Sequence, residues 1–429
     1  MEHVQAALGL LALIALCWAF STNRQAVSWR PVVWGVILQF IIAAVVLLAD
    51  FGKGIFDFID RGMNKLVDFS QAGSNFVFQA VEHHQITVVS DSNVPIVKDI
   101  IGEISPPLKT IAFWVLPTII FFSALIAVAY HYGVMQKVVG FFARIMNKTL
   151  GTSGAESLAN AANIFVGQTE APLLVKPYVG TMTLSELHSV MLNGFANTAG
   201  GVLAIYIAVL PIAGIGGHLV TATLMSAPAA VAVAKLLVPE TEIPQTLGTV
   251  QVPVERIDYN GLDALARGTT EGLSLFLNVL AMLLVFFAVV TMVNFLLHAI
   301  GGLVGVDISL ELIFGYLFAP FALLMGVPWD EALRVGMLLG KKITLTELMA
   351  YLDLANIQHS AAPLSDRTAK IASYALAGFA NFASIGIQIG GISVMAPHRR
   401  GDLARLSMRA MLGGMVATMM CGAVAGIFI

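Results

Sequence analysis

Charged residues are scarce in this sequence of 429 residues. Asp, Glu, Lys and Arg together account for 11% of it, whereas soluble domains carry about 25%. Apolar residues account for 58%, and the mean hydropathy is +0.84. We therefore expect an integral membrane protein. The net charge of −3, without a basic stripe interleaved with aromatic residues, gives no indication of a nucleic-acid partner.

Cysteine and patterned histidine are also lacking. The two cysteines, Cys17 and Cys421, lie in apolar runs and are interpreted as small buried hydrophobic residues rather than as a disulfide. The nine histidines are scattered without metal-ligand spacing. No HExxH or GxSxG motif and no candidate pair of a nucleophile and a base are found, so we do not expect an enzyme.

Long apolar runs predict membrane-spanning helices, each near the ~20 residues needed to cross a bilayer. The first run lacks a basic segment and a clear cleavage site, so we interpret it as a retained span rather than a signal peptide. Residues 308–326 are either a further span or an interfacial helix. The candidate spans are 4–21, 31–50, 111–131, 187–209, 217–238, 272–297, 371–395 and 403–428.

Two further segments are expected to lie along the membrane surface. Residues 51–106 are too charged to span, and their first part places apolar side chains such as Ile59 and Leu66 near one helical face. This pattern is typical of an amphipathic helix in the membrane interface; a small extramembrane helix is the alternative. Residues 134–148 resemble another interfacial helix.

Polar residues and proline interrupt the apolar sequence at 155–178. Gly167–Glu170 and Pro172 are incompatible with a continuous membrane helix, and a broken helix is tolerated at membrane depth only where it is buried in protein or lines a wet cavity. An ionisable residue at such a place indicates a functional site.

The interrupted pattern recurs in the second half of the chain, at 331–354. Thr169-Glu170 is echoed by Thr346-Glu347, and GFANTA at 194–199 by GFANFA at 378–383. Corresponding interruptions in two halves are the best sequence pointer to the binding site of a secondary transporter. With three crossings between them, the two segments enter from opposite sides. We therefore predict an all-α membrane protein of about eight spans plus two re-entrant hairpins in an inverted repeat.

Orientation follows from the distribution of Lys and Arg. Placing both termini outside the cytoplasm puts the most basic loops inside, and we expect a multi-pass protein of the cell inner membrane. These basic residues are Arg24 and Arg30 after the first span, Lys137, Arg144 and Lys148 after the third, and Arg399, Arg400, Arg405 and Arg409 near the last.

The polar residues of the repeats suggest the ligand. Glu170 and Glu347 are acceptors for hydroxyl or N–H groups, and Gln168 offers the bidentate pattern that reads a base edge. The site also contains neutral donors and acceptors on Thr169, Asn381 and Ser384, and the ring of Phe379. Together these groups suit an uncharged, hydroxyl-rich ligand with a planar heterocycle. Three alternatives remain open: Glu347 pairs with Lys341 or Lys342, Asn197 and Asn381 serve as interhelical hydrogen bonds, and Phe195 and Phe379 only pack.

The run GQTEAPLLVKPY at 167–178, followed by SELH at 185–188, resembles the concentrative nucleoside transporters. In the second half, Thr346-Glu347, YAL at 374–376, GFAN at 378–381 and MAP at 395–397 resemble the same family. The similarity is clear over 155–400, whereas the first hundred residues match in hydropathy alone. The chain is therefore identified as a member of that family, of bacterial type.

This resemblance implies a homotrimer with a scaffold and a mobile transport domain in each protomer. The scaffold would comprise 1–150 and 239–326, and the transport domain 151–238, with the first hairpin, and 327–429, with the second. By the same resemblance, the nucleobase would be held by Gln168, Thr169 and Glu170, with Val202 against it. The ribose hydroxyls would be held by Glu347, Asn381 and Ser384, with Phe379 nearby.

The family's sodium site would correspond to Asn163, Val166, Asn197 and Thr198. Hard cations prefer oxygen ligands, but Asn197-Thr198 departs from the hydroxyl-then-aliphatic pair of sodium-coupled relatives. We expect a sodium-coupled importer of nucleosides such as uridine, working by alternating access in the lipid bilayer. A proton-coupled version with Glu170 as the proton carrier is the alternative, ahead of a channel or an intramembrane enzyme.

Overall fold

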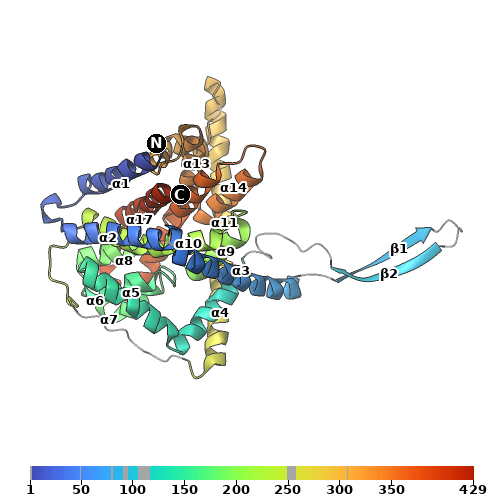
Figure 1. Ribbon diagram of the computed structural model, residues 1–429, viewed down its shortest axis with the longest axis horizontal. Helices are drawn as coiled ribbons and strands as arrows, with labels where there is room; N and C mark the ends of the chain where they lie inside the picture. Colours follow the sequence, from blue (N-terminus) through green and yellow to red (C-terminus); the bar gives the residue numbers. More distant parts are fainter. Residues whose placement is uncertain are drawn as a thin grey trace.

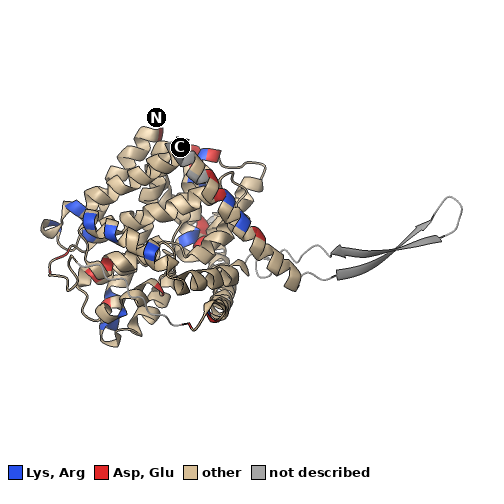
Figure 2. Cartoon of the chain, turned by 60° about the horizontal axis from the view of Figure 1, so that its bottom comes forward, with Lys and Arg blue, Asp and Glu red and all other residues tan. Residues whose placement is uncertain are grey.

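Helices make up nearly all of the protein. The computed structural model describes residues 2–48, 50–78, 81–89, 95–104, 116–248, 258–306 and 308–429. Its helices pack into one body, from which a two-stranded β-hairpin projects (Figure 1). Charged residues are sparse along the chain of this body, in keeping with the composition (Figure 2).

Five helical segments in the described residues are long and apolar enough to cross a membrane, or up to seven if each of two bent helix pairs counts as one span. The predicted membrane-spanning helical fold is thereby confirmed. The predicted span 111–131 is described only from 116 on. The five segments are Glu2–Ala19 (α1), Trp29–Leu47 (α2 Trp29–Ala43 and η2 Ala44–Leu48), Leu184–Val209 (α8 and α9), Ile215–Leu237 (α10) and Pro397–Phe428 (η5 Pro397–Arg399 and α17 Arg400–Phe428).

The first two spans pack against the rest through glycines. A Cβ added at Gly9 of α1 would lie 1.7 Å from the carbonyl oxygen of Leu324 in α12 (Leu310–Leu324). A Cβ added at Gly35 of α2 would lie 2.7 Å from the carbonyl oxygen of Pro228 in α10. Small residues let membrane helices approach closely without losing backbone hydrogen bonds, so these glycines fix α1 and α2 against α12 and α10.

The bent pairs explain two ambiguous segments. α4 (Thr118–His131) is followed by α5 (Val134–Leu150) at 82°, through Gly133 with φ +73°. α12 is followed by α13 (Trp329–Thr344) at 119°. α5 coincides with the predicted interfacial helix at 134–148. α12, which covers the ambiguous segment 308–326, forms one bent pair with α13 rather than a separate straight span.

α11 (Gly261–Val304) is longer than the predicted span 272–297. Its 44 residues extend about 66 Å at 1.5 Å per residue, roughly twice a bilayer's hydrocarbon core. Asn260 caps its first turn by accepting from the backbone N–H groups of Leu262 and Asp263. The helix therefore begins in the polar loop between the two halves, which the hydropathy of the span alone did not indicate.

Residues 51–106 contain a helix and a hairpin. α3 (Asp50–Phe78) is the expected amphipathic helix, and Asp60 on it accepts from the backbone N–H of Gly217 at 3.2 Å, which binds it to the start of α10. β1 (Val81–Val89) pairs antiparallel with β2 (Pro95–Ile104). This hairpin was not predicted, because its sequence was assigned only as a charged extramembrane stretch.

Two similar halves surround the centre of the molecule. In the first, α6 (Gly154–Ala162), η4 (Ala171–Val175) and α7 (Lys176–Val179) form an interrupted segment, followed by α8 (Leu184–Ala196) and α9 (Gly200–Val209). In the second, α13 and α14 (Glu347–His359) precede α15 (Asp366–Leu376) and α16 (Phe382–Ser393). Each half thus has an interrupted segment, as the recurring sequence predicted, and then a helix that breaks at its GFAN motif within a predicted span.

Candidate functional site

The breaks in the two GFAN helices contact each other. α8 ends at Ala196 and α15 at Leu376. The backbone N–H of Gly378 donates to the hydroxyl of Thr198 at 2.8 Å. Gly378 has φ +92°, and a Cβ there would lie 2.4 Å from the carbonyl oxygen of Ala196. Only glycine fits this left-handed position and this close approach.

The first interrupted segment reaches the second half through Gln168. Its Nε2 donates to Ser384 Oγ at 3.2 Å, and its Oε1 accepts from Gln388 Nε2 at 2.9 Å. Gln388 also donates to the carbonyl oxygen of Met191 at 3.0 Å, which ties α16 to α8. Sequence reasoning found Gln168 and Ser384 but missed Gln388, which lies on an unbroken stretch of α16 and has no counterpart in the quoted motifs.

Glu347 stands at the first position of α14 and is almost completely buried. It accepts from the hydroxyl of Tyr206 at 2.8 Å and from Asn381 Nδ2 at 3.0 Å. Asn381 also caps α16, because its Oδ1 accepts from the backbone N–H of Ser384 at 2.9 Å. Four of the predicted ligand residues, Gln168, Ser384, Asn381 and Glu347, therefore form one hydrogen-bonded chain across the two halves.

The alternative lysine partners of Glu347 are engaged elsewhere. Lys341 forms an ion pair with Asp353. Lys342 donates to the carbonyl oxygens of Ala375 and Ala377 at 3.0 and 2.9 Å. The hydrogen bonds of Glu347 are with neutral donors, so the interpretation of this residue as one half of a lysine ion pair is wrong.

The remaining predicted ligand residues lie around this chain. Thr169 donates to the carboxylate of its neighbour Glu170 at 3.0 Å, and the Glu170 side chain is exposed. Thr169 also faces α16, since a Cβ at Gly391 would lie 2.5 Å from its Cγ2. Val202 is buried on α9, and Phe379 is half-buried at the second break. Of these residues, Thr169 thus approaches the second half of the chain.

Two of the four predicted sodium ligands, Asn163 and Asn197, are joined through Asn193. Asn163 ends α6, and its Nδ2 donates to Asn193 Oδ1 at 3.4 Å. Asn197 donates to the same oxygen and accepts from the hydroxyl of Ser226. Thr198 accepts from Gly378, as described above. Sequence reasoning missed Asn193 and Ser226, which lie on continuous helices.

The donor set of this second cluster fits a hard cation. Na⁺ accepts neutral oxygen ligands at a helix break. This set offers such oxygens on the side chains of Asn163, Asn197 and Thr198 and on the backbone carbonyl of Val166. Asn163, Asn197 and Thr198 are each at most 4% exposed. In the part of the chain that the structure describes, no group of three or more His, Cys, Asp and Glu residues is arranged to hold a metal ion.

Tyr206 emerges as the residue that orients Glu347. It is fully buried, and its ring stacks on Tyr351 with centroids 4.2 Å apart. We expect Tyr206→Phe to weaken binding of the ligand predicted from the sequence, uridine, about fivefold, because a hydrogen bond to the Glu347 side chain is lost, at a net cost of about 1 kcal/mol after rearrangement. Isothermal titration of the purified variant measures this.

Tyr351→Phe is the matched control for that variant. It removes a hydroxyl of the same kind, which donates to the carbonyl oxygen of Ser373 at 2.7 Å rather than to Glu347. Equal uridine affinities in Tyr206→Phe, Tyr351→Phe and the wild type would mean that the Tyr206 hydroxyl does not orient Glu347 for binding.

Two interrupted segments and two broken helices that meet at buried polar residues define a membrane-embedded secondary transporter. Comparison with known families specifies the type. The chain matches the model of the "Na+ dependent nucleoside transporter C-terminus" over 218–426, that of the corresponding N-terminus over 8–81, and a "Nucleoside recognition" model over 112–213. This chain belongs to the Na⁺-dependent nucleoside transporter family.

Individual relatives agree with this assignment. The chain is 40% identical to "Uncharacterized transporter YutK" of Bacillus subtilis, with 98% of both chains covered. It is 36% identical to human "Sodium/nucleoside cotransporter 1", covering 99% of this chain and 64% of that relative. A solved structure of CNTnw in an inward-facing substrate-bound state superposes with a TM-score of 0.87 at 37% identity, covering 100% of this chain and 98% of that one. The resemblance thus extends to the first hundred residues, beyond the 155–400 seen in the motifs.

Proposed function

We propose that this protein is a sodium-coupled nucleoside symporter that imports nucleosides by alternating access. The observation that carries the proposal is the hydrogen-bonded chain Gln168–Ser384–Asn381–Glu347, because it joins the two inverted halves at the breaks of their helices. A ligand bound there contacts both halves at once, as a transported substrate at a repeat interface must.

The ribose is assigned to the second half of the site. A carboxylate has about four acceptor positions, and Glu347 uses two of them on Tyr206 and Asn381. The free positions suit paired hydroxyls, with Asn381, Ser384 and Phe379 beside them. The chain offers the ligand acidic and neutral groups, which favours an uncharged nucleoside over a phosphorylated nucleotide.

The nucleobase is assigned to the first interrupted segment. Gln168 presents both a carbonyl and an amide NH₂, with Thr169 and Glu170 next to it and Val202 on α9. In the present packing, Gln168 and Ser384 satisfy each other at 3.2 Å. An entering nucleoside would replace that bond with its own base edge and hydroxyl, so the residues are paired until the ligand arrives.

Sodium is the proposed coupling ion, held by Asn163, Val166, Asn197 and Thr198. Asn197 Oδ1 and Thr198 Oγ1 already accept hydrogen bonds from Ser226 and Gly378. Each neutral oxygen retains a further lone pair for a cation. Proton coupling through Glu170 is the competing mechanism. Its support is the exposed Glu170 carboxylate, which accepts a hydrogen bond from Thr169.

The proposed orientation has both termini outside the cytoplasm of a cell with an inner membrane. The termini lie side by side, since His3 Nδ1 is 3.1 Å from the carbonyl oxygen of Gly426 (Figure 1). The remaining assignments, a homotrimer in the bilayer with a scaffold of 1–150 and 239–326 and a transport domain of 151–238 and 327–429, rest on membership of the family.

Uptake of labelled uridine into proteoliposomes tests this function. We expect concentrative uptake with an inward sodium gradient and none with a proton gradient alone, and we expect uracil, which lacks ribose, to compete far less than uridine. Uptake driven only by protons would transfer the coupling role to Glu170. If neither gradient drove uptake, the substrate assignment would be refuted, and equal competition by uracil would refute the ribose contacts.

A further inference from the structure

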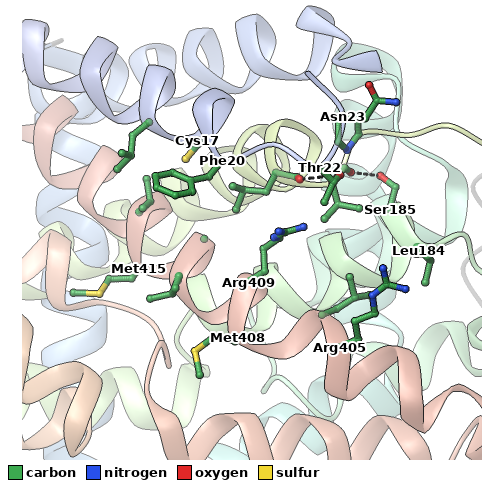
Figure 3. Close-up of a pocket in the computed structure, with 18 of the residues that line it drawn as sticks. Cys17, Phe20, Thr22, Asn23, Leu184, Ser185, Arg405, Met408, Arg409 and Met415 are labelled. Atoms are coloured by element: carbon green, nitrogen blue, oxygen red, sulfur yellow. Dashed lines mark hydrogen bonds between the residues drawn. The ribbon is translucent and has the colours of Figure 1, made fainter. Parts of the chain in front are cut away.

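A large cavity lies apart from the proposed nucleoside and sodium residues. Its volume is about 1070 Å³, and it opens between α1, α12, α17 and the adjoining ends of α8 and α10 (Figure 3). None of the residues assigned to nucleoside or sodium lines it. Its apolar wall comes from three helices and includes Leu16, Phe20, Phe318, Phe321 and Met415.

One end of the cavity is cationic. Arg405 and Arg409 are four residues apart on α17 and therefore share one face of the helix. Both are exposed, and Figure 3 shows Arg409 extending between the α17 backbone and the Thr22–Ser185 side of the cavity. No ion pair involving either arginine is present among the residues that the structure describes.

The carboxylate of Glu240, which also lines the cavity, is committed to other partners. It accepts from Thr183 Oγ1 at 2.9 Å and pairs with Lys235 Nζ at 3.4 Å. Glu242 lines the rim and is exposed. Both arginines thus line a partly apolar cavity and form no ion pair among the described residues, so their guanidinium groups are available to an anion.

Exposed tryptophans flank the loop that lines the cationic end of the cavity. Trp18, Trp29 and Trp34 are partly or largely exposed on α1 and α2 beside the loop that contains Thr22 and Asn23. Exposed tryptophans gather at the headgroup level of a bilayer. Thr22 also binds the carbonyl oxygen of Leu237 through its backbone N–H at 2.9 Å, so this wall of the cavity is held in place.

We propose that this cavity binds an anionic phospholipid, with its phosphate on Arg405 and Arg409 and its acyl chains along the apolar wall. Guanidinium groups bind phosphate oxygens through paired hydrogen bonds, and basic pockets between membrane helices on the cytoplasmic side bind anionic headgroups. The loop after α1 is on the side predicted to be cytoplasmic. A bound lipid would join α1 and α12 to α17.

The test uses the full-length protein purified in detergent. Lipid binding is measured by native mass spectrometry and by the shift of Tm when phosphatidylglycerol, phosphatidylcholine or inorganic phosphate is added. We expect phosphatidylglycerol to bind and raise the Tm, and the other two to have little effect. In R405Q/R409Q, the affinity for phosphatidylglycerol should fall about thirtyfold, equivalent to about 2 kcal/mol at about 1 kcal/mol per arginine.

R144Q/R400Q is the matched control, because it also removes two exposed arginines, neither of which lines the cavity. It should bind phosphatidylglycerol like the wild type, and R405K/R409K should retain part of the affinity. Equal loss in R144Q/R400Q would indicate non-specific attraction and overturn the proposal. Two measurements on the wild type also test the proposal, even if R405Q/R409Q did not fold. Phosphatidylcholine binding as strong as that of phosphatidylglycerol, or a Tm shift with inorganic phosphate as large as that with phosphatidylglycerol, would overturn it.

Discussion

Replacing Glu347 by glutamine is expected to weaken uridine binding at least tenfold. The carboxylate has only acceptors, and it receives hydrogen bonds from Tyr206 and Asn381 while retaining positions for the ribose hydroxyls. The amide replaces one acceptor oxygen with an NH₂ donor. If that donor faced Asn381 Nδ2, two donors would meet. It must therefore turn toward Tyr206 and the ligand, where it opposes hydroxyl groups that previously donated.

The expected magnitude follows from the kind of bond that is lost. A hydrogen bond to a charged group contributes about 1.5–3 kcal/mol, and about 1.4 kcal/mol is tenfold in affinity. Titration of purified E347Q with uridine measures the change. E271Q is the control, because Glu271 lies on the exposed surface of α11 and pairs only with Arg267 among the described contacts. Uridine binding by E347Q at the level of E271Q would remove Glu347 from the site.

The recurrence of Thr-Glu and GFAN was sufficient to predict the two interrupted segments, whereas the GFAN helices were predicted as the unbroken spans 187–209 and 371–395. Breaks need residues that tolerate exposed backbone, such as Gly378, so they leave a local signature that hydropathy and spacing reveal. The same signature identified Gln168, Glu347, Asn381 and Ser384, which stand at breaks and helix starts. The inverted arrangement followed from counting the crossings between them.

The supporting residues left no such signature. Tyr206, Gln388, Asn193 and Ser226 lie on regular helix faces, where a polar side chain in an apolar run is equally consistent with interhelical packing. Their roles depend on which helix lies opposite, and no single-helix pattern contains that information. For the same reason the sequence suggested Lys342 as a partner of Glu347, five residues away, while the fold directs its ammonium group to the end of α15.

The largest structural effect is expected from Lys342→Met. The Lys342 side chain is completely buried, and its ammonium group donates to the carbonyl oxygens of Ala375 and Ala377 and to Thr418 Oγ1, at 2.9 to 3.0 Å. The two carbonyls belong to the end of α15 and the break that follows it. The last carbonyls of a helix lack intrahelical partners and carry partial negative charge. Lys342 therefore supplies hydrogen-bond donors to the carbonyl oxygens at the second break.

Methionine has a similar length but no donor, so K342M would leave these acceptors buried without partners at a cost of about 1–3 kcal/mol each. We expect a fall in Tm well beyond that of any single surface change, together with loss of uridine uptake, because Gly378 and Asn381 are positioned by the same break. K341M is the control: Lys341 pairs with Asp353 at a partly exposed site, where an ion pair contributes about 0–1 kcal/mol. If K342M and K341M had equal Tm values and equal uptake, the ammonium group would not hold the second break. A large difference in Tm and uptake would show that the ammonium group holds the second break.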